Sequence, residues 1–310
     1  MGADRPTRVT TCGPSRGHDR SRRVGRCPGL LLRAVRWDPR PGRRDGEPVS
    51  STQTSRTQDD PSRYARLRTF NWIAAVVHAA QAVAVVVLAT DFTLPVTATY
   101  LSGPPGTPPG DQVTLWDVPT ALAIAAFLAL SAVFHVIVAS PGVFERYRAG
   151  LAQGHNYFRW VEYSLSSSLM IVIIAQLVGI SDVVALLALF GVNASMILFG
   201  WLQEKYHQPG DGGWLPFVFG CFAGAVPWIG VVVYTIAPGS TSGAEPPGFV
   251  YGIIVSLFLF FNVFALVQWL QYKPVGRFRD YLTGETAYIV LSLTAKSALA
   301  WQIFVGTLMG

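Results

Sequence analysis

Apolar residues in this chain come in long runs separated by short polar stretches. A helix needs about 20 mostly apolar residues to cross the hydrocarbon core of a bilayer. The seven runs that reach this length are residues 70–90, 118–139, 157–179, 182–202, 214–236, 249–271 and 285–308. Gly and Pro between the runs favour turns. The pattern predicts an all-α membrane protein, a bundle of seven transmembrane helices.

The connection between the first two runs, residues 91–117, is long enough to fold on its own. It contains the turn-forming sequence Gly-Pro-Pro-Gly-Thr-Pro-Pro-Gly at positions 103–110. Residues 93–101 and 112–116 on either side have the Thr, Val and aromatic content of short strands. We therefore expect a small β-hairpin here, with an irregular loop as the alternative.

Composition supports the membrane assignment. Apolar residues make up 51% of the chain and charged residues only 14%, whereas soluble domains carry about 25% charged residues. This balance argues against an ordinary soluble enzyme and against a disordered protein. The three cysteines are too few and too scattered for a disulfide framework or a zinc site.

The positive charge is concentrated at the N-terminus. Sixteen of the 21 arginines lie in residues 1–68. We expect residues 1–60 to be a disordered, Arg-rich extension, or a stretch translated from a start codon upstream of the true one, and residues 61–310 to form the membrane domain. A nucleic-acid or anionic-lipid arm is the alternative, but we expect no nucleic-acid partner.

Basic residues also predict the orientation. Short cytoplasmic loops of membrane proteins carry an excess of Lys and Arg. Apart from Lys296, these residues lie only before the first span and in or beside every second connection, among them Arg56, Arg63, Arg66, Arg68, Arg146, Arg148, Arg159, Lys205, Lys273, Arg277 and Arg279. We expect a multi-pass protein of the cell membrane with a cytoplasmic N-terminus, an extracellular C-terminus and an extracellular hairpin. This orientation argues against a G-protein-coupled receptor.

Two charged residues lie well inside predicted spans, Glu162 in the third and Lys296 in the seventh. A charge near the middle of a bilayer is costly and therefore suggests a function. Glu162 lies ~8 Å and Lys296 ~17 Å from the cytoplasmic ends of their helices, and the long lysine side chain leans back toward that end. The two can meet if the helices are neighbours. Asp117, Glu204 and Glu285 fall near span ends, where we expect them to be solvated.

A buried lysine next to one carboxylate suits imine chemistry. Burial disfavours the charged amine, and a neutral amine can attack an aldehyde. The protonated imine that results needs a carboxylate close by, and Glu162 is the one available to Lys296. This is the arrangement of retinal proteins. The alternative is an ion pair that only fixes helix packing, although such pairs are weak stabilisers.

Two segments closely resemble heliorhodopsins: WVEYSLSSSLM at residues 160–170 and SLTAKSALAWQIF at residues 292–304. The resemblance covers residues from about 60 to 310, and the predicted cytoplasmic N-terminus agrees with it. It implies all-trans retinal bound to Lys296 as a protonated Schiff base, with Glu162 as counterion. It also implies a homodimer whose contacts include the first external hairpin.

The residues that ion pumps use are missing. Pumping microbial rhodopsins commonly have an acid four residues before the retinal lysine, where this chain has Ser292, and often a second acid eleven residues after the counterion, where it has Ile173. Ser166 can form a hydrogen bond but is a weak relay. We expect a photoreceptor with a slow signalling photocycle, no ion pumping and an unknown cytoplasmic signalling partner.

Two other functions remain open. One is a light-driven ion transporter or light-gated proton channel of the same fold. The other is an intramembrane enzyme, for which the chain has no recognisable nucleophile, metal-ligand set or phosphate-binding loop.

Further polar and aromatic residues are candidates for the retinal site. A polyene needs a long apolar slot with aromatic walls, and any of these side chains could instead serve ordinary packing. The wall candidates are Trp160, Tyr163, Ser166, Asn193, Met196, Ile197, Pro227, Trp228, Phe261, Gln268, Ser292 and Trp301. His78, His135 and Gln81 are candidates for a proton-accepting cavity, with hydrogen-bonded packing as the alternative for both histidines. No third ligand is evident, so we predict no metal site.

Overall fold

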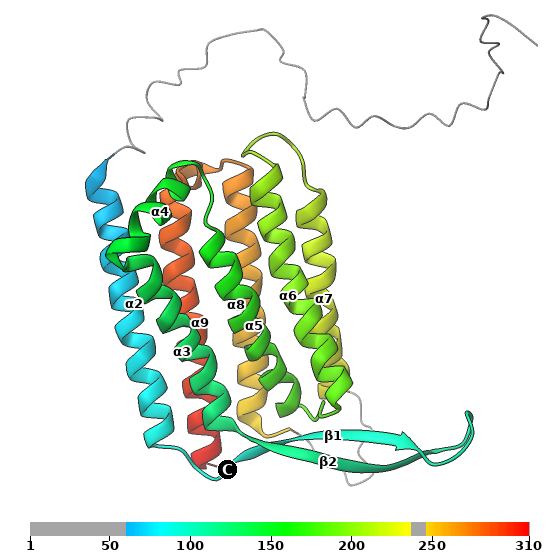
Figure 1. Ribbon diagram of the computed structural model, residues 1–310. Helices are drawn as coiled ribbons and strands as arrows, with labels where there is room; N and C mark the ends of the chain where they lie inside the picture. Colours follow the sequence, from blue (N-terminus) through cyan, green and yellow to red (C-terminus); the bar gives the residue numbers. More distant parts are fainter. Residues whose placement is uncertain (1–59, 237–245, 310) are drawn as a thin grey trace, which may run out of the picture. The chain divides into compact units, whose positions relative to one another are not determined.

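A computed structural model describes residues 60–236 and 246–309, and the predicted extension lies outside these residues apart from Asp60. Seven described helices are long and apolar enough to cross a membrane. They are α2 (Pro61–Val87), α3 (Thr120–Ala139), α5 (Tyr157–Leu177), α6 (Val183–Tyr206), α7 (Leu215–Ile236), α8 (Gly248–Tyr272) and α9 (Tyr281–Met309). They lie side by side as a bundle (Figure 1). The predicted seven-helix architecture is confirmed.

Some helices extend beyond their apolar runs, and polar side chains cap the first turns of several. Helix α2 begins nine residues earlier than predicted, where the carboxylate of Asp60 accepts a hydrogen bond from the Ser62 amide. The side chains of Asn156 and Asp182 cap α5 and α6 in the same way. Capping side chains satisfy amide groups that the first turn leaves free.

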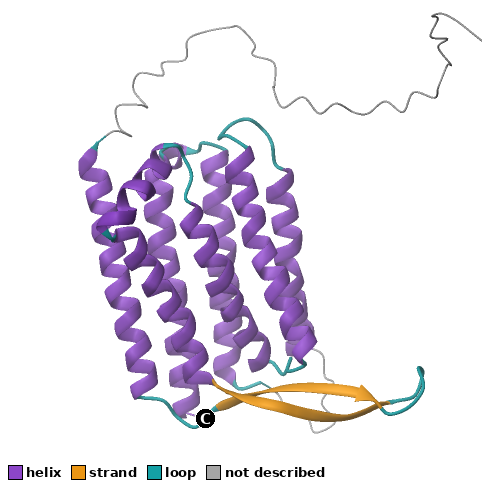
Figure 2. Cartoon of the chain, in the orientation of Figure 1, coloured by secondary structure: helices purple, strands orange, loops and turns teal. Residues whose placement is uncertain are grey.

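One helix was not predicted. Helix α4 (Pro141–Ala152) follows α3 directly, in a segment that the sequence suggested was a loop. Pro141 occupies its first turn, a position that proline favours, and Phe144, Tyr147 and Leu151 form its buried face. The charged residues between them made the segment look like a loop. It lies at the same end of the bundle as the beginning of α2 (Figure 2).

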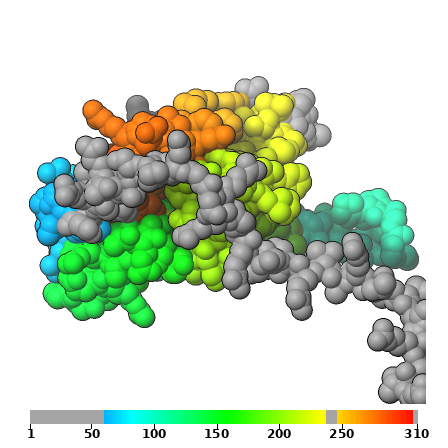
Figure 3. All heavy atoms as spheres, turned by 90° about the horizontal axis from the view of Figure 1, so that it is seen from above, coloured from blue at the N-terminus to red at the C-terminus, as the bar shows by residue number. Residues whose placement is uncertain are grey.

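The predicted hairpin is also confirmed. Strands β1 (Thr93–Leu101) and β2 (Pro109–Pro119) pair antiparallel. The amide of Thr97 donates to the Ser181 carbonyl at 2.8 Å, and Gln176 donates to the Pro95 carbonyl at 3.2 Å. These bonds hold β1 against the α5–α6 connection, while the tip of the hairpin projects past the bundle (Figures 1 and 3).

Three apolar clusters lie in the bundle among the described residues, and two of them contain most of the buried apolar side chains. The larger one joins the hairpin residues Leu94 and Val96 to side chains such as Met170, Ile174 and Leu299. The smaller one lies around α4 and includes Tyr64, Phe144, Tyr147, Leu151 and Ile289. Helix α5 is the central element of the bundle. In its most apolar 18-residue stretch 61% is buried, compared with 17% in the corresponding stretch of α6.

An ion pair joins the beginnings of α2 and α9. The guanidinium of Arg63 donates two hydrogen bonds to the carboxylate of Asp280. Burial acts to raise the pKa of Asp280, but the hydrogen bonds from Arg63 and Thr283 outweigh it and hold this pKa below its usual range. The carboxylate therefore stays charged at neutral pH and keeps the two helix ends together.

Candidate functional site

Lys296 and Glu162 meet inside the bundle. The Nζ of Lys296 lies 2.9 Å from Oε1 of Glu162 and donates to the Ser292 hydroxyl, one turn earlier in α9, at 2.7 Å. The Ser131 hydroxyl of α3 donates to the same Glu162 oxygen at 2.6 Å. Both charged side chains are at most 5% exposed. Helices α3, α5 and α9 thus supply an amine, a carboxylate and two hydroxyls to one buried point.

The aromatic ring of Tyr163 lies beside this pair. The Nζ of Lys296 is 5.0 Å from the centre of the ring, within the range of a cation–π contact. The Tyr163 hydroxyl donates to the Tyr288 carbonyl at 2.9 Å. Tyr163 therefore offers its ring face, and not its hydroxyl, to the amine.

Two small cavities lead away from Lys296 toward α7. The first, of about 50 Å³, is lined by Lys296 itself and by side chains of α5, α6, α8 and α9. The second, of about 90 Å³, reaches Phe217, Gly220 and Cys221 of α7. The two share a wall made of Tyr163, Met196, Ile197, Phe261 and Phe264. Together they trace an apolar path that begins at the amine.

Most of the predicted wall residues lie on this path. Those that line one or both cavities are Trp160, Tyr163, Ser166, Met196, Ile197, Phe261, Gln268 and Ser292. The hydroxyl of Ser166 is buried and has no hydrogen-bond partner among the described residues. The sequence missed Phe264, Met170 and Tyr288, which are apolar or aromatic residues with no distinctive spacing.

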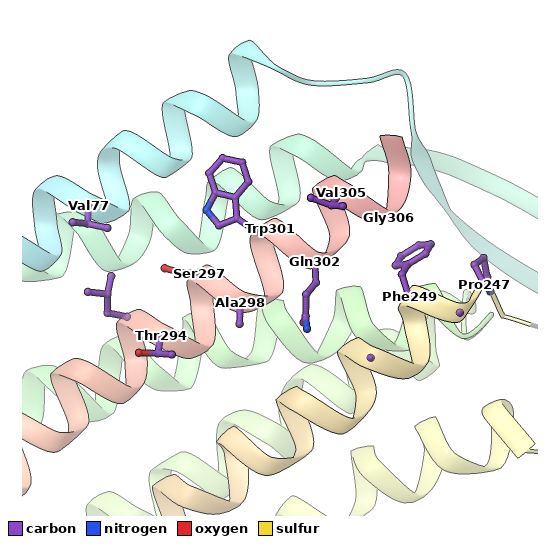
Figure 4. Close-up of a pocket in the computed structure, with 13 residues that line it drawn as sticks. Val77, Pro247, Phe249, Thr294, Ser297, Ala298, Trp301, Gln302, Val305 and Gly306 are labelled. Carbon is purple, nitrogen blue, oxygen red and sulfur yellow. The ribbon is translucent and has the colours of Figure 1, made fainter. Parts of the chain in front are cut away.

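Four predicted wall residues do not line the path. Asn193 is buried, but its amide donates to the hydroxyls of Ser167 and Ser168. Trp228 packs edge-on against Phe261 from outside, at 5.5 Å between ring centres, and Pro227 lies inside α7 beside it. Trp301 instead lines a separate open groove of about 1130 Å³ between α8 and α9 (Figure 4).

Gly200 lets Trp160 form the end of the second cavity. A Cβ atom on Gly200 would lie 2.5 Å from the Trp160 ring. We predict that Gly200→Ala pushes this ring into the cavity, destabilises the protein by about 1–3 kcal/mol and weakens retinal uptake, measured as the rise in visible absorbance after retinal addition. Gly191→Ala is the control on the same helix, because nothing lies within 4 Å of the Cβ it adds. Equal uptake by both variants would contradict this prediction.

The two predicted cavity histidines lie together. Their rings stack with centres 5.7 Å apart, and Nδ1 of His135 is 2.8 Å from Oδ1 of Asn71. Neither ring nitrogen of His78 has a partner among the described residues. Gln81 does not join them, because its amide bonds with the hydroxyl of Ser297.

A cavity of about 40 Å³ connects these polar groups with Glu162. His135, Asn71 and Glu162 line it, together with Glu285 and Arg159. His78 and Gln81 do not line it. No three His, Cys, Asp or Glu side chains converge as metal ligands within the described residues.

The expectation that Glu204 and Glu285 are solvated at span ends is wrong. Both carboxylates pair with the guanidinium of Arg159, and all three side chains are at most 4% exposed. Asn156 donates to both carboxylates through its backbone and side-chain nitrogens, and the Tyr281 hydroxyl donates to Glu204 at 3.1 Å. Arg159, predicted to lie in a basic loop, is in fact the centre of a buried ionic cluster. We refer to Arg159, Glu204 and Glu285 as the ionic cluster.

Comparison with known proteins assigns the chain to a family. A family model described as Heliorhodopsin matches residues 67–308. The chain belongs to the heliorhodopsin family. Among solved structures, its fold is similar to that of xanthorhodopsin, described as a light-driven ion pump with dual chromophore, with a TM-score of 0.51 and 12% identity over 79% of this chain and 93% of that one. None of the curated proteins compared with it matches.

Membership of the heliorhodopsin family and the rhodopsin-like fold indicate what kind of protein holds this site. The family and the fold make the chain a multi-pass membrane protein that responds to light through a retinal chromophore. Neither is typical of enzymes. The path from Lys296 fits such a chromophore in chemistry, since its walls are aromatic, Met and Ile side chains with few polar groups.

Proposed function

We propose that this heliorhodopsin is a photoreceptor in which all-trans retinal forms a protonated Schiff base with Lys296 and Glu162 is the counterion. The observation that carries the proposal is the buried contact of 2.9 Å between Lys296 and Glu162, at one end of an apolar path. The retinal supplies a conjugated polyene that absorbs light and isomerises. The chain holds the Lys296 nitrogen against Glu162 and Ser292 and excludes water from it.

The counterion role predicts the colour of one variant. The Glu162 charge stabilises positive charge at the nitrogen in the ground state, so Glu162→Gln should lower the excitation energy and move the visible band to longer wavelength. The spectrum of the retinal-loaded protein at a pH that keeps the imine protonated measures this shift. Glu145→Gln, at an exposed position that pairs with Arg148, should leave the band in place. An unmoved band in Glu162→Gln would exclude Glu162 as the counterion.

The absence of ion pumping is also proposed. The half of the bundle between Lys296 and the hairpin is filled by the larger apolar cluster, which contains Ile173 at the position where pumps often have an acid. Among the described residues, the buried polar side chains near the hairpin are those of Thr97, Thr120 and Gln176, and none of them carries a charge. A pump needs proton-carrying groups on both sides of the Schiff base, and these buried side chains supply none.

A light-gated proton channel is the second candidate. It is favoured by the polar cavity that runs from Glu162 to Glu285. A pH electrode in a suspension of illuminated vesicles, or photocurrents under voltage clamp, separates the two. Stable pH and no current support the photoreceptor, and a light-dependent current supports the channel.

Orientation and assembly belong to the same proposal. The end of the bundle that carries Arg146, Arg148, Lys273, Arg277 and Arg279 faces the cytoplasm, where a signalling partner would bind. The hairpin then lies outside, and its exposed apolar side chains, such as Leu101 and Trp116, contact a second copy. Reaction of Lys205 and Lys273 with a membrane-impermeant cross-linker, added to one side of sealed vesicles, tests the orientation. The mass of the purified protein in solution tests whether it is a dimer.

A further inference from the structure

A groove of about 500 Å³ lies between α3, α4 and α5, at the end of the bundle where α2 begins. Its floor is aromatic and comes from three helices, with Phe134 of α3, Tyr147 of α4 and Phe158 of α5. It is separate from the path that leads from Lys296 toward α7. The groove exists because α4 folds back at Pro141 and leaves a gap before α5 begins.

The side chains at the mouth of the groove are basic. Arg146 lines it, is exposed and has no ion pair within the described part of the chain. Arg148, two residues later, does not line the groove and is paired with Glu145 at 3.3 Å. His155 also lines the groove, and its ring stacks on Tyr157 with 4.4 Å between centres. None of the nine described residues that line the groove is acidic.

Gly150 brings His155 to this place. A Cβ atom at position 150 would lie 3.0 Å from the His155 carbonyl oxygen and 3.1 Å from its ring. Any larger residue would push the imidazole away from α4. The glycine therefore allows the imidazole and the Arg146 guanidinium to border one groove.

We infer that this groove binds the headgroup of an anionic phospholipid. Arg146 and His155 contact the phosphate, and the aromatic floor packs against the glycerol and the first part of the acyl chains. Basic pockets between membrane helices bind anionic headgroups, and an amphiphile matches a groove that has a positive mouth and an apolar floor. A lipid is favoured over a soluble anion because phosphate alone would leave the aromatic floor uncovered.

The groove also borders the counterion cavity. Phe134, Tyr147, Asn156 and Phe158 line both the groove and the small cavity that contains Glu162. A lipid in the groove would therefore rest on the outer side of a wall whose inner side faces the counterion. The inference itself does not depend on retinal, on light or on the orientation of the protein.

Native mass spectrometry of the full chain in detergent, titrated with phosphatidylglycerol or phosphatidylcholine, tests the inference. We expect the wild type to retain phosphatidylglycerol in preference to phosphatidylcholine. Arg146→Gln should bind phosphatidylglycerol about fivefold more weakly, as expected for one basic residue near an anionic headgroup, and Arg146→Gln/His155→Gln more weakly still. Arg148→Gln is the matched control and should bind as the wild type does, with melting temperature reporting the fold of each variant.

Three outcomes would overturn the inference. The first is equal retention of the two lipids by the wild type. The second is equal loss of phosphatidylglycerol in Arg146→Gln and Arg148→Gln, which would indicate a diffuse surface charge. The third is displacement of the lipid by glycerol phosphate at concentrations similar to those of the lipid, which would indicate a site for a soluble anion. Because the protein is kept in the dark without retinal, none of these outcomes bears on the proposed photoreceptor.

Discussion

Lys296→Ala should leave the protein colourless after incubation with all-trans retinal, whereas the wild type develops a visible band. Only an amine can form the imine, and the other two lysines, Lys205 and Lys273, do not line the path along which the chromophore would lie. The expected effect is complete loss of the band in the absorption spectrum of the purified protein. Lys273→Ala is the control, because it removes a lysine that stacks near Trp214 at the surface.

Removing Lys296 also leaves Glu162 as an uncompensated buried charge, which could unfold the protein for an unrelated reason. The double variant Lys296→Ala/Glu162→Gln removes that charge and keeps the bundle neutral at this point. It too should be colourless, with a melting temperature close to that of the wild type. A visible band in a folded double variant would show that the retinal is attached elsewhere.

Arg159→Gln should destabilise the protein by about 3–5 kcal/mol, because it leaves the two buried carboxylates of the ionic cluster without their cation. For a domain of this size we expect the melting temperature to fall by roughly 6–20 °C. Thermal unfolding followed by circular dichroism measures the change. Arg148→Gln removes an exposed pair with Glu145 and a contact at 5.8 Å with the Tyr64 ring, and it should change stability by no more than about 1 kcal/mol.

A rescue variant shows whether charge is the cause. Arg159→Gln/Glu204→Gln/Glu285→Gln removes the cation and both carboxylates, so that no net charge stays buried. It should recover most of the lost stability. If it stays as unstable as Arg159→Gln, the contacts of the Arg159 guanidinium with the rings of Trp160 and Tyr288, at 4.5 and 4.1 Å from the ring centres, would account for the loss instead.

The long apolar runs were sufficient to predict the helices that span the bundle. Crossing a bilayer requires a minimum length of apolar sequence, so the signal does not depend on tertiary contacts. The meeting of Glu162 and Lys296 was also predictable, since depth in each helix follows from counting residues. Helix α4 was missed because it is short and amphipathic, although the spacing of Phe144, Tyr147 and Leu151 could have revealed it.

The ionic cluster could not be predicted from the same arguments. Arg159, Glu204 and Glu285 each lie near the end of an apolar run, where a charged side chain is usually exposed to the interface. Their burial depends on three helix ends coming together, and the sequence states no distance between those ends. The residues that form the walls of the apolar path could not be predicted either. Asn193 and Phe264 both lie within apolar helices, and only the rotation of each helix about its axis decides which side chain faces the cavity.

The ionic cluster joins three helices of the bundle by charged contacts and leaves two others without such contacts. Its charged groups come from α5, α6 and α9, and neither α7 nor α8 contributes one. Those two helices are held to the rest by uncharged contacts, such as the bond from Gln268 to the Gly200 carbonyl and that between Ser256 and Gln302. After light absorption we therefore expect α5, α6 and α9 to stay together as one rigid unit. We expect α7 and α8 to move relative to them, because no charged contact of the ionic cluster opposes that motion.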